Sequence, residues 1–399
     1  MIQTLREKVR SIAKSWGPAW LVMIADVDAA SAITAAESGA QYGTKLIWFI
    51  MLLTLPLYVI QEVAGRVGAV TAKGLGELIR ENYSRRVAFL SAIPMALVDI
   101  ISYVVEYTGI AVGFEMMGVP PVVSVPIAFL AHVLVVYKRK YAEAEKPLLV
   151  ISAIFTVIWI IAGFLTARNG IVITPFYFST SPDFVFMLAA NIGAVIMPFM
   201  LFYQVSATAE KGTGPDSVWA VRFETLVGAL FSEVIMAAIA LSAIGISATA
   251  LDFTSPGVLS QSLVSVAGHF APYAFGIALI TASFIALIVI SLGSSWGVTE
   301  ALGWGRKHWF KVYLVESIPA VIIPLFSFNL VKLALNLMVL QIVVLIAPAV
   351  ILGVLASNPK LMGAFRLKGF NRYVYWGTIV LIFGTGVVSL MPTLQAFFH

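Results

Sequence analysis

The sequence predicts an all-α, polytopic membrane protein with about eleven transmembrane helices in two inverted repeats. The first observation is composition: 60% of the 399 residues are apolar and 11% are charged, whereas soluble domains have about 45–50% and about 25%. The second is a succession of apolar runs long enough to span a bilayer. The third is that polar residues interrupt two of these runs near their middles, a pattern typical of transporters built from repeats.

The apolar runs follow one another with short connections rich in Pro, Gly or charge. Their approximate limits are 17–38, 44–65, 87–114, 120–137, 148–167, 184–208, 218–247, 270–300, 312–328, 333–356 and 374–396. Segments 1 to 5 form the first repeat (about 17–168) and segments 6 to 10 the second (about 184–356), with segment 11 as an extra helix. We expect a single transmembrane domain over residues 1–399.

Basic residues set the expected orientation. With a cytoplasmic N-terminus, 22 of the 25 Lys and Arg fall on the inside, and only Lys45, Arg168 and Lys332 fall outside. This positive-inside bias also supports the number of spans, because a missed span would scramble the alternation. The basic stretch before segment 1 is followed directly by a full-length span, so no cleavable signal is expected. The predicted location is the cell membrane, with the C-terminus outside.

Composition also excludes several kinds of site. The chain has no Cys, which rules out disulfides and thiolate metal sites, and its four His (132, 269, 308 and 399) are too dispersed for a zinc site. Basic residues are scattered singly, which argues against nucleic acid as a partner. With no nucleophile–base pair or phosphate loop in view, enzyme chemistry is not expected.

Segment 1 carries two carboxylates, Asp26 and Asp28, at its centre. An acid there costs roughly 2.5–3.5 kcal/mol on insertion scales. On an intact helix the two would point about 200° apart, so both can face one site only if the helix opens. Acids together with freed carbonyls suit a cation. The alternative is an intact helix with one acid reaching into a polar bundle interior.

Segment 6 is interrupted between Asn191 and Pro198. Pro198 removes a backbone donor and frees carbonyls in the preceding turn, and a bound cation would supply their missing partner. The adjacent Met197 adds a thioether, which favours softer transition metals over magnesium or calcium. The alternative is a simple proline kink with Met197 filling the core.

Motifs in the chain resemble those of the Nramp family of divalent metal transporters. They are Gly17-Pro18-Ala19, the run from Ser38 to Trp48, the run from Gln61 to Thr71, Asp28-Ala29-Ala30-Ser31, Met197-Pro198-Phe199, Gly293-Ser294-Ser295 and Leu361-Met362-Gly363. The resemblance implies a LeuT-like fold, with an ion site between broken helices 1 and 6. It identifies Asp28 and Met197 as the metal-binding side chains. Ser31 stands where the family has Asn, and Ala29-Ala30 where it has Pro-Gly.

The expected ligand set therefore contains side chains and carbonyls. Asp28 supplies charge, Met197 a soft contact, and Ser31 with carbonyls near Ala25 and Ala194 the remaining ligands; Asp26 is a candidate second carboxylate. The divalent metal is the transported substrate, and no cofactor is expected. A monomer is the expected oligomeric state.

Four positions that the family associates with proton movement fall on Tyr103, Glu106, Phe199 and Gln204. Only Glu106 retains a group suited to titrate in the physiological range. We therefore expect proton coupling to be weak or absent. Asp99, in the same segment as Glu106, is expected near the helix end, paired with Arg85, Arg86 or lipid headgroups.

The sequence favours a secondary transporter that imports divalent metal ions of the manganese and iron class, and conceivably magnesium, by alternating access. One alternative keeps the fold but carries an amino acid or another small organic solute, whose amine the acids would bind. A further alternative is a non-transporting receptor on the same scaffold, although no signalling module is visible in the loops.

Overall fold

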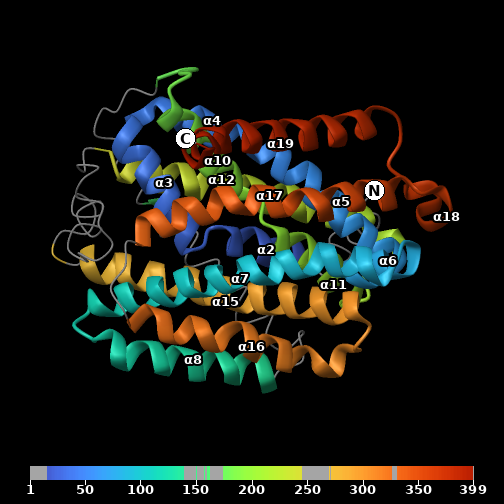
Figure 1. Cartoon of the computed structure of the whole chain (residues 1–399), viewed down its shortest axis with the longest axis horizontal. Helices are drawn as coiled ribbons and strands as arrows, with labels where there is room; N and C mark the ends of the chain where they lie inside the picture. Colours follow the sequence, from blue (N-terminus) through green and yellow to red (C-terminus); the bar gives the residue numbers. More distant parts are fainter. Residues whose placement is uncertain are drawn as a thin grey trace, which may run out of the picture.

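The computed structural model describes residues 16–138, 174–244, 271–325 and 330–398, with isolated residues 150, 157, 160, 161 and 269. Every regular element in these ranges is helical (Figure 1). The α-helices are α2 (Pro18–Asp26), α3 (Ala29–Tyr42), α4 (Ile47–Leu52), α5 (Thr54–Thr71), α6 (Leu75–Asn82), α7 (Arg85–Glu115), α8 (Pro121–Lys138), α10 (Pro182–Val195), α11 (Pro198–Glu210), α12 (Val218–Ser242), α15 (Ala271–Leu302), α16 (Trp309–Ile322), α17 (Leu330–Ser357), α18 (Pro359–Met362) and α19 (Gly369–Phe398).

Within the described residues, six helical stretches are long and apolar enough to cross a membrane. They are Ala29–Thr71, Arg85–Glu115, Pro182–Glu210, Pro215–Ser242, Phe275–Leu302 and Val331–Ser357, and the apolar helix Pro121–Tyr137 is shorter. The first stretch contains a turn at Gly43, where φ is 58°, between expected segments 1 and 2. Expected segment 5, at 148–167, lies outside the described residues apart from isolated positions. The count of eleven spans therefore stays a prediction.

The close packing of α7 against α15 depends on glycine. A Cβ built on Gly113 of α7 would lie 2.7 Å from the Gly276 oxygen of α15, and one on Gly276 would lie 2.5 Å from the Gly113 oxygen. Further along, Tyr103 of α7 donates to Ser291 of α15 at 3.1 Å, so the two helices run antiparallel. In membranes such small residues let backbones approach closely, which locks α7 against α15.

Helix α12 lies along the whole of segment 1. At its start, Glu224 accepts hydrogen bonds from the amides of Gly17 and Trp20 at 2.6 and 2.9 Å. One turn on, a Cβ on Gly228 would lie 2.8 Å from Met23 of α2. Residue numbers thus increase in the same direction along α12 and along segment 1, so the two run parallel. Two spans that cross the membrane in the same direction would have this arrangement.

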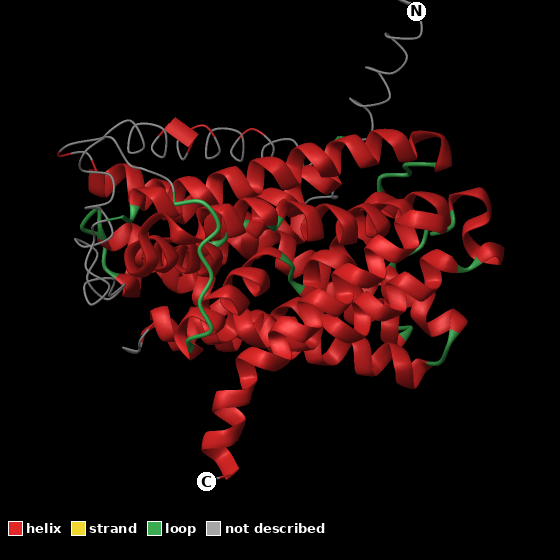
Figure 2. Ribbon diagram, turned by 90° about the horizontal axis from the view of Figure 1, so that it is seen from above, coloured by secondary structure: helices red, strands yellow, loops and turns green. Residues whose placement is uncertain are grey.

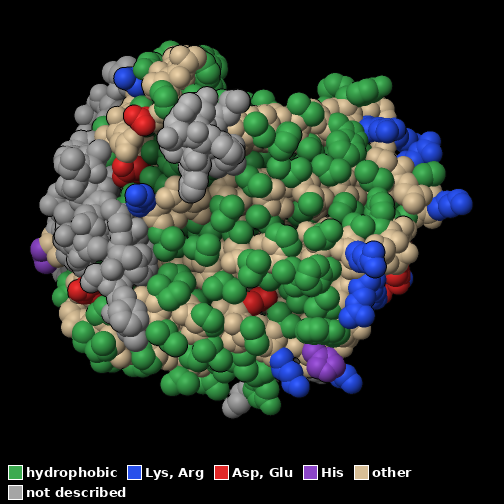
Figure 3. Space-filling model, in the orientation of Figure 1, with side chains coloured by type: hydrophobic (Ala, Val, Ile, Leu, Met, Phe, Trp, Pro, Cys, Tyr) green, Lys and Arg blue, Asp and Glu red, His purple; other side chains and the backbone are tan. Residues whose placement is uncertain are grey.

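The surface divides into an apolar middle and a charged end. Figure 2, seen from above, shows the helices running roughly along the long axis of the bundle. On the face shown in Figure 3, hydrophobic side chains cover the middle, and most Lys and Arg gather at the end where α6 and α18 lie. This distribution matches a chain that sits in a bilayer with one basic side.

Candidate functional site

The helix of segment 1 is interrupted at its two acids. Helix α2 ends at Asp26, and Val27 leaves the helical conformation with φ −81° and ψ 57°. Asp28 is extended and caps α3, because its Oδ1 accepts a hydrogen bond from the Ser31 amide at 2.7 Å. Asp is a strong N-cap residue. The helix therefore restarts at Ala29 with an aspartate cap and needs no Pro-Gly pair to interrupt it.

Segment 6 is open at Ile196 and Met197. Both residues are extended, with ψ of 95° and 148°, between the end of α10 and the start of α11. Pro198 occupies the first position of α11, where its missing amide costs no helical hydrogen bond. Met200 places its sulfur 3.4 Å from the Met197 amide. This second thioether at the break was not among the residues singled out from the sequence.

The two breaks meet inside the bundle. The Ser31 hydroxyl donates to the Ala194 carbonyl at 2.8 Å. Further along the same pair of half-helices, the Asn191 amide donates to the Ser38 hydroxyl, also at 2.8 Å. Asp28, Ser31, Ala194 and Met197 are all buried. The structure thus joins the Asp28 cap, the Ser31 hydroxyl and the Ala194 carbonyl into one buried group, with Met197 on the second break.

Glu106 belongs to the same region. From α7, its Oε2 accepts a hydrogen bond from the Ala29 amide at 3.1 Å, and its carboxylate interacts electrostatically with Asp28. The first amides of a helix carry partial positive charge and lack helical partners. Two acids therefore share the N-terminus of α3, which explains how the fold tolerates Glu106 in this position.

Asp26 points to a different neighbour from Asp28. Its Oδ2 accepts a hydrogen bond from Ser232 of α12 at 2.8 Å. Ala25, just before it, is buried in the last turn of α2, where carbonyls lose their helical partners. The hydrogen bonds thus tie Asp26 to α12 and tie Asp28 to the start of α3.

Tyr103 lies in a separate hydrogen-bonded network. Its hydroxyl donates to Ser291, which is 2.9 Å from His132 Nε2, and His132 Nδ1 is 2.8 Å from the Tyr107 hydroxyl. His132 is fully buried between α7, α8 and α15. Nothing in the sequence indicated the polar partners of His132, because helix packing brings them together.

The remaining proton-route positions are buried without titratable groups. Phe199 packs its backbone against Gly293, whose Cβ would lie 2.7 Å from the Phe199 oxygen. Gln204 is fully buried, and its amide atoms have no hydrogen-bond partner among the described residues. Neither side chain is able to carry a proton, as its residue type implies.

The expectation for Asp99 was wrong. Asp99 is fully buried at the middle of the 31-residue helix α7, and it interacts electrostatically with Glu316 of α16. Neither oxygen of Asp99 has a hydrogen-bond partner within the described part of the chain. The expected pairing with Arg85 or Arg86 fails because both lie at the start of α7, about 20 Å away at 1.5 Å per residue.

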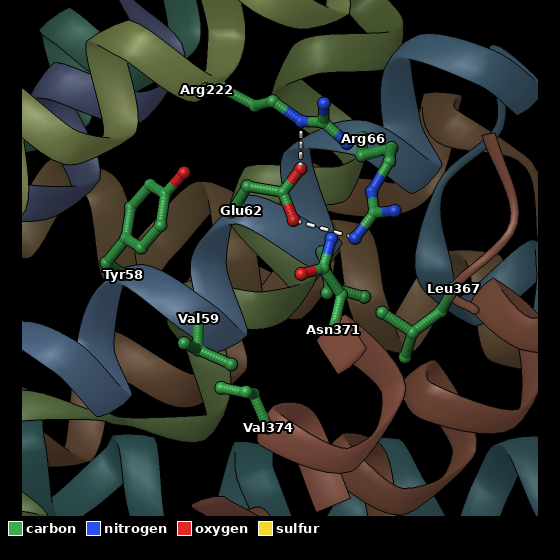
Figure 4. A pocket seen from close by; sticks show the side chains of 9 residues that line it. Tyr58, Val59, Glu62, Arg66, Arg222, Leu367, Asn371 and Val374 are labelled. Atoms are coloured by element: carbon green, nitrogen blue, oxygen red, sulfur yellow. Dashed lines mark hydrogen bonds and ion pairs between the residues drawn. The ribbon is translucent and has the colours of Figure 1, made fainter. Parts of the chain in front are cut away.

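A pocket opens between α5, α12 and the start of α19 (Figure 4). Glu62 bridges two arginines there, accepting from Arg66 Nη2 at 2.7 Å and from Arg222 Nε at 2.6 Å. Arg66 also donates to the Phe365 carbonyl at 3.1 Å. The pocket has a volume of about 180 Å³. The ion pairs thus tie α5 to α12, and the hydrogen bond to Phe365 ties α5 to the turn that precedes α19.

No group of three or more His, Asp and Glu in the described ranges is arranged to hold a metal ion. A cation at the two breaks would instead meet mixed donors: a carboxylate from Asp28, a hydroxyl from Ser31, a carbonyl from Ala194 and the sulfur of Met197. Such a set combines hard and soft ligands, which a borderline transition metal tolerates better than magnesium.

Solved transporters share this fold. A manganese transporter of Eremococcus coleocola superposes with a TM-score of 0.79 at 18% identity, covering 97% of this chain and 88% of that one. The transporter MhsT, solved with L-phenylalanine, gives 0.64 at 12% identity and covers 95% and 98%. Mhp1, a nucleobase-cation-symport-1 transporter, gives 0.61 at 14%, covering 96% and 92%. These likenesses confirm the LeuT-like fold, whereas the helix count and inverted repeats stay predictions.

Sequence relatives narrow the family. A divalent metal cation transporter, MntH, of Klebsiella pneumoniae is 24% identical over 388 residues, covering 92% of this chain and 91% of that protein. A second MntH, from another strain of the same species, has the same identity and coverage. The family model described as natural resistance-associated macrophage protein-like matches residues 19–392. The chain therefore belongs to the Nramp family.

Proposed function

We propose that this protein is a secondary transporter that carries divalent metal ions of the manganese and iron class across the cell membrane. The observation that carries the proposal is the meeting of two helix breaks, where Ser31 donates to the Ala194 carbonyl at 2.8 Å beside the Asp28 cap. Support also comes from the relatives, which are named as divalent metal cation and manganese transporters.

The chemistry at the breaks fits a dehydrated dication. Asp28 supplies the countercharge, and a dication in low dielectric without one would be costly. Rotation of the Ser31 hydroxyl away from Ala194 would free two oxygen ligands at once. Met197 contributes a thioether, which favours manganese, iron or cadmium relative to magnesium and calcium.

We further propose inward transport by alternating access, with the N-terminus in the cytoplasm. Broken helices let half-helices on either side of a midplane site move as separate bodies. Proton coupling is weak or absent in this proposal, because Phe199 and Gln204 cannot titrate.

Asp28→Ala tests the site assignment. The variant should abolish manganese uptake into proteoliposomes and remove the manganese binding at the two breaks that calorimetry detects, while the protein stays folded and inserted. Glu37→Gln is a matched control, since Glu37 is a buried acid of α3 that bonds only Gln41 among the described side chains. Manganese uptake by Asp28→Ala at the unmodified rate would refute the assignment, and uptake of amino acids in place of metal would refute the metal function.

A further inference from the structure

Four buried carboxylates surround the break in segment 1. Glu233 interacts with Asp26, Asp26 interacts with Asp28, and Asp28 interacts with Glu106. None of the four forms an ion pair with a described Lys, Arg or His. One dication balances at most two of these charges. Uncompensated charge in a membrane interior is expensive, so the two acids that lie away from Asp28 need compensation of their own.

The unmet hydrogen-bonding capacity is concentrated at Asp26 and Glu233. Both side chains are fully buried. Asp26 Oδ1 and both oxygens of Glu233 have no hydrogen-bond partner in the part of the chain that the structure describes. Only Asp26 Oδ2 is satisfied, by the Ser232 hydroxyl at 2.8 Å. Buried carboxylate oxygens without donors are rare in folded proteins, and a cation is one partner that would satisfy three of them together.

The backbone adds further oxygens at the same place. Asp26 is the last residue of α2, and the final carbonyls of a helix lack helical partners and carry partial negative charge. Helix α12 is held in register by the close approach of Gly228 to Met23, which brings the next turn of α12, with Ser232 and Glu233, beside Asp26. Carboxylates, a hydroxyl and helix C-terminal carbonyls therefore converge from two elements.

We propose that Asp26, Glu233 and Ser232 form a second cation site, distinct from the Asp28 site, whose oxygen donors suit a hard dication such as Mg²⁺ and also accept Mn²⁺. The donors are oxygen only, the set that Mg²⁺ prefers and that gives soft metals no advantage. Two carboxylates match the charge of one dication. The site goes beyond the proposed transport function, since it lies between α2 and α12 and needs neither Met197 nor Ala194.

The test measures metal stoichiometry on the full chain in detergent, with Mg²⁺ or Mn²⁺ as the only added metal. The unmodified protein should bind two Mn²⁺ per chain. Asp28→Ala should keep one Mg²⁺ site. Asp26→Asn/Glu233→Gln should keep one Mn²⁺ but raise the Mg²⁺ dissociation constant more than about 100-fold, because even outer-shell partners account for about 10–100-fold.

Asp99→Asn is the matched control, because Asp99 is equally buried and equally without hydrogen-bond partners among the described residues. It should leave both stoichiometries unchanged.

Ser232→Ala keeps both acids and should weaken Mg²⁺ binding about tenfold or more, so the proposal stays testable if the double amide variant does not fold. One Mn²⁺ per unmodified chain, or Mg²⁺ binding that is indifferent to Glu233, would overturn the second site and leave the Asp28 site standing. If Asp28→Ala binds neither Mn²⁺ nor Mg²⁺, the second site would also be overturned.

Discussion

At the residue scale, the proposed metal preference rests on sulfur at the second break. Met197 is fully buried on the extended residues between α10 and α11, and Met200 turns its sulfur back toward the same backbone. Thioethers interact weakly with hard cations and better with soft ones. The sulfur of Met197 is therefore the atom at the breaks best suited to discriminate among dications.

We expect Met197→Ala to lower the affinity for cadmium or manganese and to relax discrimination against magnesium. Competition of Mg²⁺ with Mn²⁺ or Cd²⁺ for uptake into proteoliposomes measures this preference. Met187→Ala controls for lost core volume, because Met187 is buried in α10 away from the break. If the unmodified protein already takes magnesium as well as manganese, Met197 does not face the ion, and hard oxygen ligands such as Asp26 explain the selectivity instead.

At the element scale, the Glu62 cluster joins α5 to α12 and to the turn before α19, which are distant in sequence. Arg66 is 3% exposed, whereas the Arg222 side chain is 42% exposed. A buried ion pair is strongly destabilising when one partner is removed, because the other charge stays buried. An exposed pair contributes little. The two arginines that contact Glu62 should therefore respond very differently to mutation.

Glu62→Gln should reduce the free energy of unfolding by about 3–5 kcal/mol, since it leaves Arg66 buried without its countercharge. Arg222→Gln should cost only about 0–1 kcal/mol. Thermal unfolding in detergent, followed by loss of the monodisperse peak on size exclusion, measures both variants. Equal shifts in the thermal unfolding midpoint of the two variants would contradict this prediction. They would mean that the buried charge on Arg66 does not account for the stability of the cluster.

At the scale of the whole molecule, proton coupling needs stations along an entire path. Glu106 contacts the first turn of α3 beside Asp28, while Tyr103 bonds into the Ser291 and His132 network. No hydrogen bond between these two groups occurs among the described residues. Phe199 and Gln204 add no titratable station, and a tyrosine ordinarily titrates at about pH 10.

We expect manganese uptake to follow the metal gradient and the membrane potential with little proton flow. Proteoliposomes loaded with a pH dye, under an inside-negative potential, should show metal uptake without matching acidification. Glu106→Gln should leave that small signal unchanged. Robust acidification that scales with uptake and disappears in Glu106→Gln would contradict the prediction and would identify Glu106 as the proton carrier.

Sequence alone was sufficient wherever the physical cause is local or compositional. Apolar runs between basic connections predict membrane helices, because the bilayer accepts only internally satisfied backbone. Pro198 and the paired acids marked both helix breaks, since each changes backbone hydrogen bonding within a few residues. The family resemblance then pointed to Asp28, Ser31 and Ala194 as ligands, and the structure brings these three residues together. Their role as metal ligands stays a prediction.

Only the tertiary structure decided which side chains face each other across helices. Asp26 and Asp28 are two residues apart, yet the break turns one toward Ser232 and the other toward the start of α3. Asp99 was expected near a helix end, yet packing buried it, and buried Glu233 too, without hydrogen-bond partners among the described residues. The physical reason is that helix rotation and register are set by contacts such as Gly228 on Met23, which join residues about 200 positions apart and leave no local pattern.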